Sequence, residues 1–215
     1  MIRCLAFLLS FLFVNICFAA FETGDVLLQS ARCGVYCDSI RASTKSPIDH
    51  AAIVVIPPKK SLFSFILRSN ASGGEVVEAW TPVTKRTPLL EFLARDGGKY
   101  IQLRLKPEYR NGKVIDAVIK VANSYVGKEY DYHFEESEDK IYCSELVYKA
   151  YDKGAGIHAG KMQKISDFDK KIAEAYWKEH FQGHIPWERD VISPAGLLMT
   201  DKFDVVYSGY PTTDR

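Results

Sequence analysis

No excess of charge of either sign is present in this chain of 215 residues. The sequence has 28 Lys and Arg against 27 Asp and Glu, a formal net charge of +1. A protein that binds nucleic acid or an anionic membrane surface normally carries a basic surplus, so we expect neither partner. Internal repeats, low-complexity tracts and linkers are also missing from the sequence. These absences favour one ordinary globular domain, for which 47% hydrophobic and 26% charged residues are typical.

Long apolar runs are scarce, and the longest lies at the N-terminus. Residues 5–14 are predominantly apolar and follow the basic Arg3. The run is too short for a permanent membrane span, and Ala19 lies where a signal peptidase requires small residues. We therefore expect residues 1–20 to be a cleaved signal peptide, 21–215 to form the exported domain, and the mature chain to lack a transmembrane span. That domain has 28 − 1 = 27 basic and 27 acidic side chains.

Cysteine is also scarce, because only Cys33, Cys37 and Cys143 remain after the signal peptide is lost. In an oxidising compartment, Cys33 and Cys37 could form a disulfide across a short loop. A zinc site built on this pair would need a second pair at metal-ligand spacing, which the sequence lacks, so we expect no metal and no cofactor. Cys143 is then an unpaired thiol in an exported protein, and chemical reactivity is one reason for such a thiol.

The residues after Cys143 predict a buried helix over 143–151. Its apolar residues recur at helical spacing: Leu146, Val147, Ala150 and Tyr151. Cys143 lies in the first turn, where free backbone N–H groups and the helix dipole favour a thiolate. The alternative is that Cys143 is a small apolar residue at the start of a core helix.

A nucleophilic cysteine needs a base, and His50 is the first candidate. It begins the run 50–56, which predicts a buried strand, and Glu78 lies in a second predicted strand, 75–80. If the two strands pair in antiparallel fashion, Glu78 comes within hydrogen-bond reach of His50 and can orient it. The alternatives are a structural histidine and an outward-facing glutamate. His133 is a rival base, but its acidic surroundings predict a solvated loop.

The remaining elements do not alternate strictly between strand and helix, which predicts an α+β fold. We expect strands over 24–28, 99–105 and 203–207, helices over 113–126 and 167–181, a short helix from 193, and a loop or irregular helix over 31–46.

Five motifs in this order resemble the YiiX/YebB group of papain-like cysteine hydrolases, a circularly permuted branch of the NlpC-type superfamily. They are Thr23-Gly24-Asp25, Asp49-His50-Ala51, Val77-Glu78-Ala79, Gly127-Lys128-Glu129-Tyr130-Asp131 and Tyr142-Cys143-Ser144-Glu145-Leu146. The resemblance implies a permuted papain-like fold with a central antiparallel sheet. It also implies Cys143 as nucleophile, His50 as general base and Glu78 as orienting acid. The backbone N–H of Cys143 is one expected oxyanion donor, and Tyr130 is the candidate for a second.

Resemblance and export together imply an exported cysteine hydrolase that cleaves an amide bond through an acyl-enzyme. A peptidoglycan peptide is the first expected substrate. The alternative is an acyl-lipid amide or ester, whose acyl group is hydrolysed or transferred. A polar groove would suit the peptide, and an apolar tunnel would suit the acyl chain. A third interpretation is a non-catalytic envelope-binding module, which predicts that Cys143 reacts as an ordinary thiol. Nothing in the sequence predicts the oligomeric state.

Overall fold

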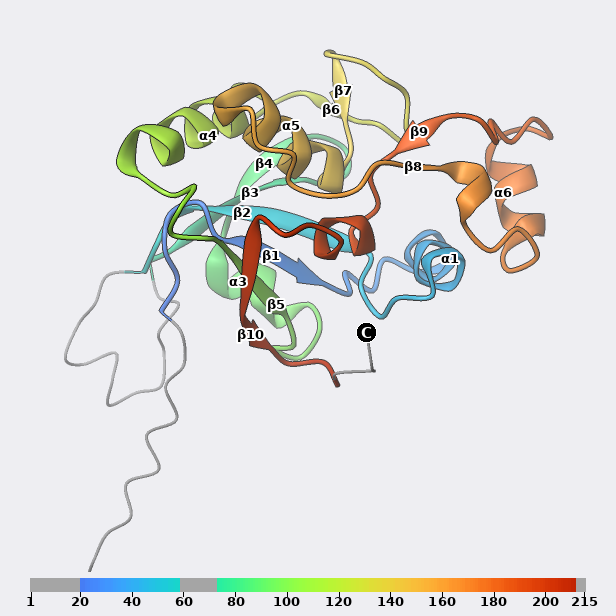
Figure 1. Ribbon diagram of the computed structural model, residues 1–215. Coiled ribbons are helices and arrows are strands. Elements are labelled where there is room, and N and C mark those ends of the chain that lie inside the picture. Colours follow the sequence, from blue (N-terminus) through green and yellow to red (C-terminus); the bar gives the residue numbers. More distant parts are fainter. Residues whose placement is uncertain (1–19, 59–72, 212–215) are drawn as a thin grey trace, which may run out of the picture.

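The computed structural model describes residues 20–58 and 73–211 (Figure 1). The apolar run of the expected signal peptide lies outside these residues. Among the helices in the described part of the chain, none has both the length and the hydropathy needed to cross a bilayer.

A six-stranded sheet in the order β10-β5-β1-β2-β3-β4 forms the centre of the fold, and every neighbouring pair is antiparallel. Its strands are β1 (Val26–Gln29), β2 (His50–Ile56), β3 (Glu75–Ala79), β4 (Thr84–Pro88), β5 (Ile101–Leu105) and β10 (Phe203–Ser208). Two short sheets pair β6 (Glu129–Tyr130) with β7 (Lys140–Ile141), and β8 (Gln163–Lys164) with β9 (Asp190–Val191). The prediction of an α+β fold around an antiparallel sheet is confirmed.

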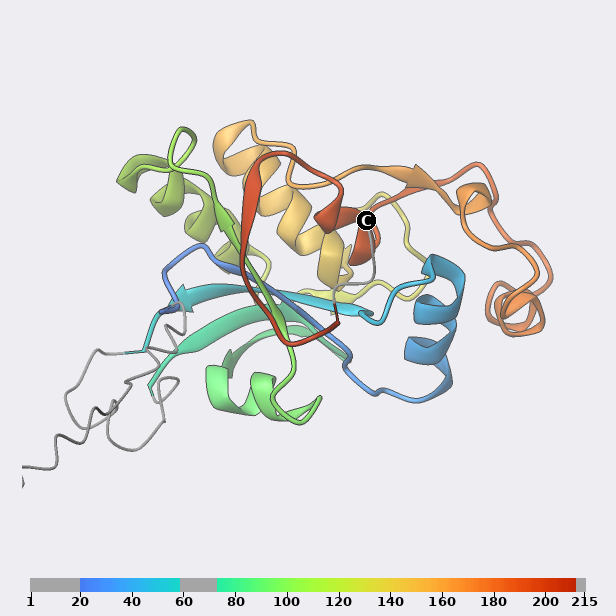
Figure 2. The same cartoon turned by 60° about the horizontal axis from the view of Figure 1, so that its bottom comes forward.

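Helices cover both faces of this sheet (Figures 1 and 2). They are α1 (Val35–Thr44), α3 (Leu89–Ala94), α4 (Gly112–Ser124), α5 (Cys143–Ala155) and α6 (Glu174–His180), with 3₁₀ turns at Ile165–Asp167 and Ala195–Leu198. Helices α4 and α5 pack on one face, where Val118, Val147 and Tyr151 join a core with β1, β2 and β5. Helix α3 packs on the other face through Leu89 and Phe92. Alternate residues of β2 therefore face different layers.

Several predicted boundaries differ from the structure. The predicted helix over 167–181 is wrong in its first half, because Ala173 adopts a left-handed conformation with φ of 60° and α6 begins only at Glu174. Residues 31–46 contain the ordered helix α1. Strand β4 and helix α3 were not predicted from the sequence. Strand β4 is a polar edge strand, Thr-Lys-Arg-Thr-Pro, and therefore lacks the apolar alternation that predicts a half-buried strand.

The Thr23-Gly24-Asp25 motif fixes the helical layer on the sheet. Gly24 has φ of +86°, and a Cβ there would lie 2.8 Å from the Ile115 side chain of α4. The Tyr151 hydroxyl of α5 donates to the Gly24 carbonyl. The buried Asp25 carboxylate accepts hydrogen bonds from Arg104 at 2.9 Å and from the Gln102 amide at 2.6 Å. This motif thereby helps to set the position of α5, at whose start Cys143 lies.

Candidate active site

Cys143 is the first residue of α5, and it is a buried free thiol. The first turn of the helix is held firmly. The Ser144 hydroxyl donates to the Ile192 carbonyl at 2.7 Å, and the Ile192 N–H donates to the Tyr142 hydroxyl at 3.1 Å. Glu145 accepts from the Tyr142 N–H at 3.4 Å. The thiol therefore lies at the positive end of a thirteen-residue helix whose entry is fixed, as a nucleophilic cysteine requires.

His50 and Glu78 meet across the β2–β3 pair. The register pairs Ile53 with Val77, and its continuation sets Trp80 opposite His50 and Glu78 diagonal to it. The imidazole Nε2 lies 2.6 Å from the Glu78 carboxylate, and both side chains are buried. Trp80 packs edge-on against the imidazole with ring centroids 5.1 Å apart. The expected antiparallel pairing thus brings the two side chains together.

Glu78 has a set of partners that the sequence analysis missed. Arg95, directly after α3, donates two hydrogen bonds to its carboxylate at 2.6 and 2.7 Å, and Thr87 of β4 donates a third at 2.5 Å. The guanidinium also lies 4.2 Å from the centre of the Trp80 ring. Burial acts to raise the pKa of Glu78, but the hydrogen bonds from Arg95 and His50 outweigh it and lower the pKa well below its ordinary value. Glu78 is therefore a fixed anion.

His50 lies between this anion and the thiol. Because Nε2 is bonded to Glu78, Nδ1 is the nitrogen that remains to interact with Cys143. Burial acts to lower the pKa of His50, but hydrogen bonds to Cys143 and Glu78 and their charges raise it from 6.5 to about 9. The imidazolium form can donate to both neighbours at once. The arrangement therefore keeps a protonated imidazole, anchored by Glu78, beside the Cys143 thiol near neutral pH.

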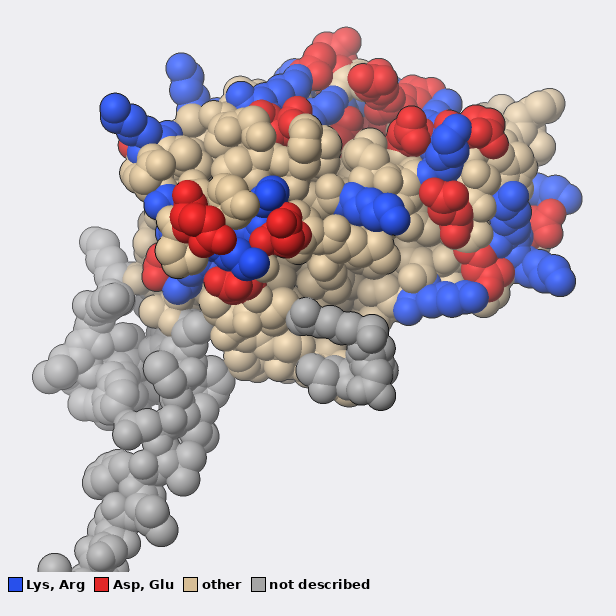
Figure 3. Space-filling model, viewed as in Figure 1, with Lys and Arg blue, Asp and Glu red and all other residues tan. Residues whose placement is uncertain are grey.

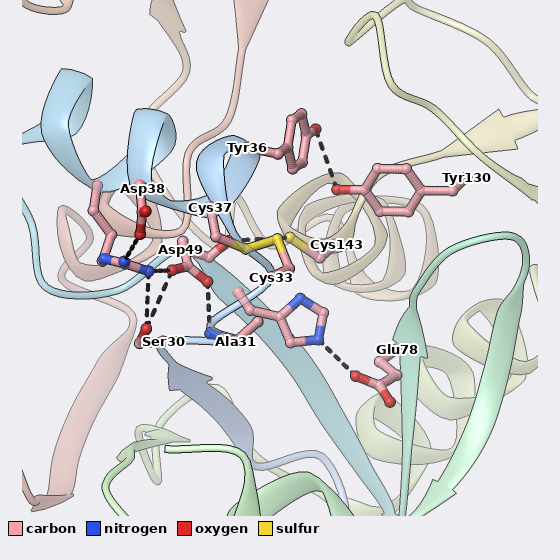
Figure 4. The surroundings of a disulfide bond; sticks show 12 residues. Ser30, Ala31, Cys33, Tyr36, Cys37, Asp38, Asp49, Glu78, Tyr130 and Cys143 are labelled. Carbon is pink, nitrogen blue, oxygen red and sulfur yellow. Dashed lines mark hydrogen bonds and ion pairs between the residues drawn. A yellow bond between two sulfur atoms is a disulfide. The ribbon is translucent and has the colours of Figure 1, made fainter. Parts of the chain in front are cut away.

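Tyr130 lies close to this centre, on β6. Its hydroxyl is 3.4 Å from that of Tyr36 in α1 (Figure 4). Burial, followed by the charges of Tyr36 and Cys143, raises the pKa of Tyr130 well above its ordinary value. The hydroxyl consequently keeps its proton and remains a hydrogen-bond donor near the thiol.

Cys33 and Cys37 are joined by a disulfide that lies beside the centre (Figure 4). The neighbouring Asp49 carboxylate is buried, accepts from the Ala31 N–H at 2.7 Å and pairs with Arg41 of α1. The backbone carbonyl oxygen of Asp49 is 3.9 Å from the Cys143 sulfur. The residue before His50 thus ties the start of β2 to α1 and to the cysteine.

The other histidines lie elsewhere. His133 is exposed and stacks near His180, which is half-buried and contacts the Tyr132 carbonyl, and His158 and His184 are exposed. Within residues 20–58 and 73–211, no group of three or more His, Cys, Asp and Glu side chains could hold a metal ion.

Two pockets open beside Cys143 and His50. The first, which we call the apolar pocket, has a cavity volume of about 80 Å³, and Cys143 lies in its wall. Its large apolar side chains include Phe134, Trp177, Phe181, Ile185, Trp187 and Ile192. The second, which we call the histidine-side pocket, is lined by His50, Trp80, Thr81, Tyr36, Tyr130 and Tyr132, together with the disulfide. Basic and acidic side chains are intermixed on the face in Figure 3, with no broad area of one sign.

Comparisons with known proteins agree with the fold. Residues 20–207 match the family described as permuted papain-like amidase enzyme, YaeF/YiiX, C92 family. The chain is similar to an uncharacterized protein, YiiX, of Escherichia coli strain K12, with 31% identity over 196 residues, which is 88% of each chain. It is also similar to the crystal structure of the metalloprotein YiiX from Escherichia coli O157:H7. That match has a TM-score of 0.75 and 29% identity, and it covers 88% of this chain and 98% of the other.

Proposed function

The chain belongs to the permuted papain-like amidase family, and we propose on this basis that it cleaves an amide bond with Cys143, His50 and Glu78 as its catalytic triad. The observation that carries the proposal is the buried imidazole held 2.6 Å from Glu78, with the free thiol of Cys143 near enough to help raise the pKa of His50. A nucleophile, a base and an orienting acid in contact are the arrangement that acyl transfer needs.

In the proposed reaction, the Cys143 sulfur attacks the substrate carbonyl while His50 holds the thiol proton. The oxyanion accepts hydrogen bonds from the Cys143 backbone N–H, which is free at the helix start, and from the Tyr130 hydroxyl. His50 then protonates the leaving nitrogen as the carbon–nitrogen bond breaks. Water attacks the acyl-enzyme with His50 as base, and the carbon–sulfur bond breaks to release the acid.

Of the two expected substrate classes, the acyl-lipid amide or ester is the one that we propose. A cell-wall peptide would need polar groups along a groove beside the cysteine. The apolar pocket instead presents aromatic and aliphatic side chains next to Cys143. We also propose export to the periplasm or beyond, which rests on the apolar N-terminal run after Arg3 and on the oxidised pair Cys33 and Cys37.

The related YiiX of Escherichia coli O157:H7 is described as a metalloprotein. The described residues of this chain do not fit a resident metal, since they contain no suitable cluster of donor side chains. The proposed mechanism accordingly uses only the triad and its hydrogen-bond donors.

The test is the rate at which iodoacetamide alkylates Cys143 as a function of pH, in the wild type and in His50→Ala. We expect the wild-type rate to level off below pH 8 and the His50→Ala profile to move to higher pH, because the imidazolium stabilises the thiolate. The exposed His158→Ala variant is the matched control and should behave as the wild type. Identical profiles for wild type and His50→Ala would remove the basis of the triad and favour a non-catalytic binding module.

A further inference from the structure

The two pockets meet at the reacting atoms but differ in which catalytic side chain they contain. Cys143 lines the apolar pocket and His50 lines the histidine-side pocket, while Asp49 and Tyr130 line both. A substrate whose carbonyl lies over the Cys143 sulfur therefore extends in two directions, one toward each pocket.

The direction in which the acyl part and the leaving group of the substrate extend follows from the transfer of the proton held by His50. When the acyl-enzyme forms, the bond between Cys143 sulfur and the carbonyl carbon is made, and the bond from that carbon to nitrogen or oxygen is broken. The proton on His50 moves to the departing atom, so the leaving group must lie on the His50 side. The part of the substrate that stays on the carbonyl must point the other way.

We propose that the apolar pocket holds the hydrocarbon chain of the acyl group, and that the histidine-side pocket holds the leaving amine or alcohol. This inference rests on the proposed function, since it uses the roles given to Cys143 and His50. It assigns a substrate orientation and makes the length of the acyl chain a determinant of specificity.

The hydroxyl groups in the wall of the apolar pocket already have protein partners. Ser43 accepts from the Trp177 indole at 2.8 Å, Thr44 donates to the Ile40 carbonyl at 2.8 Å, and Ser193 accepts from the Gly196 N–H at 2.9 Å. The hydroxyls of Tyr142 and Ser144 are bonded to the Ile192 backbone, as described above.

These engaged hydroxyls favour a hydrocarbon over a peptide in this pocket. A peptide backbone would give up hydrogen bonds to water here without a matching set of free partners, which is costly. A hydrocarbon chain gives up none and gains from leaving water. Three charged wall residues, Asp169, Lys170 and Glu174, are at least partly exposed and lie toward the solvent side of the pocket. The Asp49 carboxylate is buried, but it is already bonded to the Ala31 N–H and to Arg41.

The size of the pocket sets the expected effect. The cavity volume of this pocket is about 80 Å³, so it accommodates an acyl chain of limited length. Each methylene removed from water contributes roughly fourfold, equivalent to about 0.8 kcal/mol, until the pocket is full. The second-order rate constant should thus rise steeply with acyl chain length and then level off.

The test uses alkyl chloromethyl ketones with acetyl, hexanoyl and decanoyl chains. Cys143 displaces chloride from these reagents, so labelling does not require hydrolysis, and the alkyl group lies on the acyl side of the carbonyl. We expect kinact/KI to rise by at least about tenfold from the acetyl to the hexanoyl reagent. The same order should appear in kcat/KM for the matching acyl 4-nitroanilides.

Two substitutions separate the pockets. Thr44→Trp places an indole on the wall of the apolar pocket, and should reduce the decanoyl-to-acetyl ratio at least about tenfold. Val35→Trp adds the same side chain at an exposed position of the same helix, and should keep the wild-type ratio. Tyr132→Ala, in the histidine-side pocket, should alter the preference among leaving amines without changing the acyl-chain ratio.

The outcomes distinguish this inference from the proposed function. Labelling and hydrolysis that depend on Cys143 but not on the length of the acyl chain would overturn the proposed substrate orientation. The proposed amidase activity would then still stand. A chain-length effect that responds to Tyr132→Ala and not to Thr44→Trp would reverse the orientation. Labelling that depends on the length of the acyl chain, without hydrolysis of any anilide, would support the assignment of the apolar pocket. It would contradict the proposed amidase activity.

Discussion

The Glu78→Gln substitution tests how much of the catalytic centre depends on one buried carboxylate. Glutamine keeps the size of the side chain and an oxygen that can accept from His50, but it removes the negative charge. The change therefore isolates electrostatics from packing. It acts on a hydrogen bond of 2.6 Å between two buried groups.

The magnitude follows from the pKa of His50. Burial acts against the imidazolium, yet Cys143 and Glu78 together raise the pKa from 6.5 to about 9. That rise corresponds to roughly 3 kcal/mol of stabilisation of the charged form. The net contribution of one such hydrogen bond is on the order of 1 kcal/mol, and we assign that magnitude to the Glu78 carboxylate. We expect kcat/KM to fall by about tenfold, and its alkaline limit to move from near pH 9 toward neutral pH.

The assay is the pH dependence of kcat/KM for an acyl 4-nitroanilide, with urea unfolding to check the fold. Arg95 loses its buried charged partner in Glu78→Gln and keeps only the exposed Glu91 at 3.7 Å, so we expect a loss of about 3 kcal/mol in the free energy of unfolding. Glu75→Gln is the matched control, because Glu75 lies on the same strand but pairs with Arg86 at the surface. An alkaline limit that stays in place in Glu78→Gln would refute the assigned role of the carboxylate.

Four further predictions concern other parts of the structure. Tyr130→Phe should lower kcat by about 100- to 1,000-fold in steady-state kinetics, with little change in KM, because it removes an oxyanion donor. Arg95→Lys should lose about 1–3 kcal/mol of unfolding free energy in urea, since lysine cannot donate two parallel hydrogen bonds to one carboxylate. The free energy of unfolding should decrease as pH rises from 6.5 through about 9, by on the order of 3 kcal/mol, because the raised pKa of His50 stabilises the fold only while the imidazole is protonated. The mature protein should have a mass two hydrogens below that of its reduced form, and the Cys33→Ser, Cys37→Ser double variant should lose about 2 kcal/mol, as expected for so short a loop.

Each of these has a clear contrary result. An unchanged kcat in Tyr130→Phe would leave the second oxyanion donor unassigned. Wild-type stability of Arg95→Lys would mean that a single hydrogen bond is enough to hold the buried carboxylate. A pH profile of stability that is the same in His50→Gln as in the wild type would assign the decrease to other groups. Three free thiols in the air-oxidised protein would contradict the disulfide.

The pattern of apolar and polar residues in the sequence predicted several of the strands and helices. The apolar run from His50 to Ile56 and its stop at two prolines predicted β2, and the helical spacing after Cys143 predicted α5, because burial on one face leaves a periodic trace in the chain. Strand β4 and helix α3 left no such trace. Their polar or short segments are stabilised by contacts with β3, so only the assembled sheet explains them.

The candidate site divides in the same way. The types and order of His50, Glu78 and Cys143 were visible in the chain, and the antiparallel pairing that joins the first two was predicted from strand periodicity. Arg95 gave no comparable signal. A glutamate predicted to be buried must have a partner for its charge, but the sequence does not indicate which of the arginines lies near it.

The sequence by itself determined the local chemistry: a lone thiol at a helix start, a histidine at a strand entry, and a glutamate inside an apolar strand. These depend on neighbours within a few residues, where propensity and periodicity act. Only the tertiary structure decided the rest, namely which charge neutralises Glu78, where Tyr130 lies, and that an apolar pocket opens beside Cys143. Segments that are distant in the chain form that pocket, α1 on one side and residues 165–194 on the other. Its lining depends on how those segments pack, which no local pattern encodes.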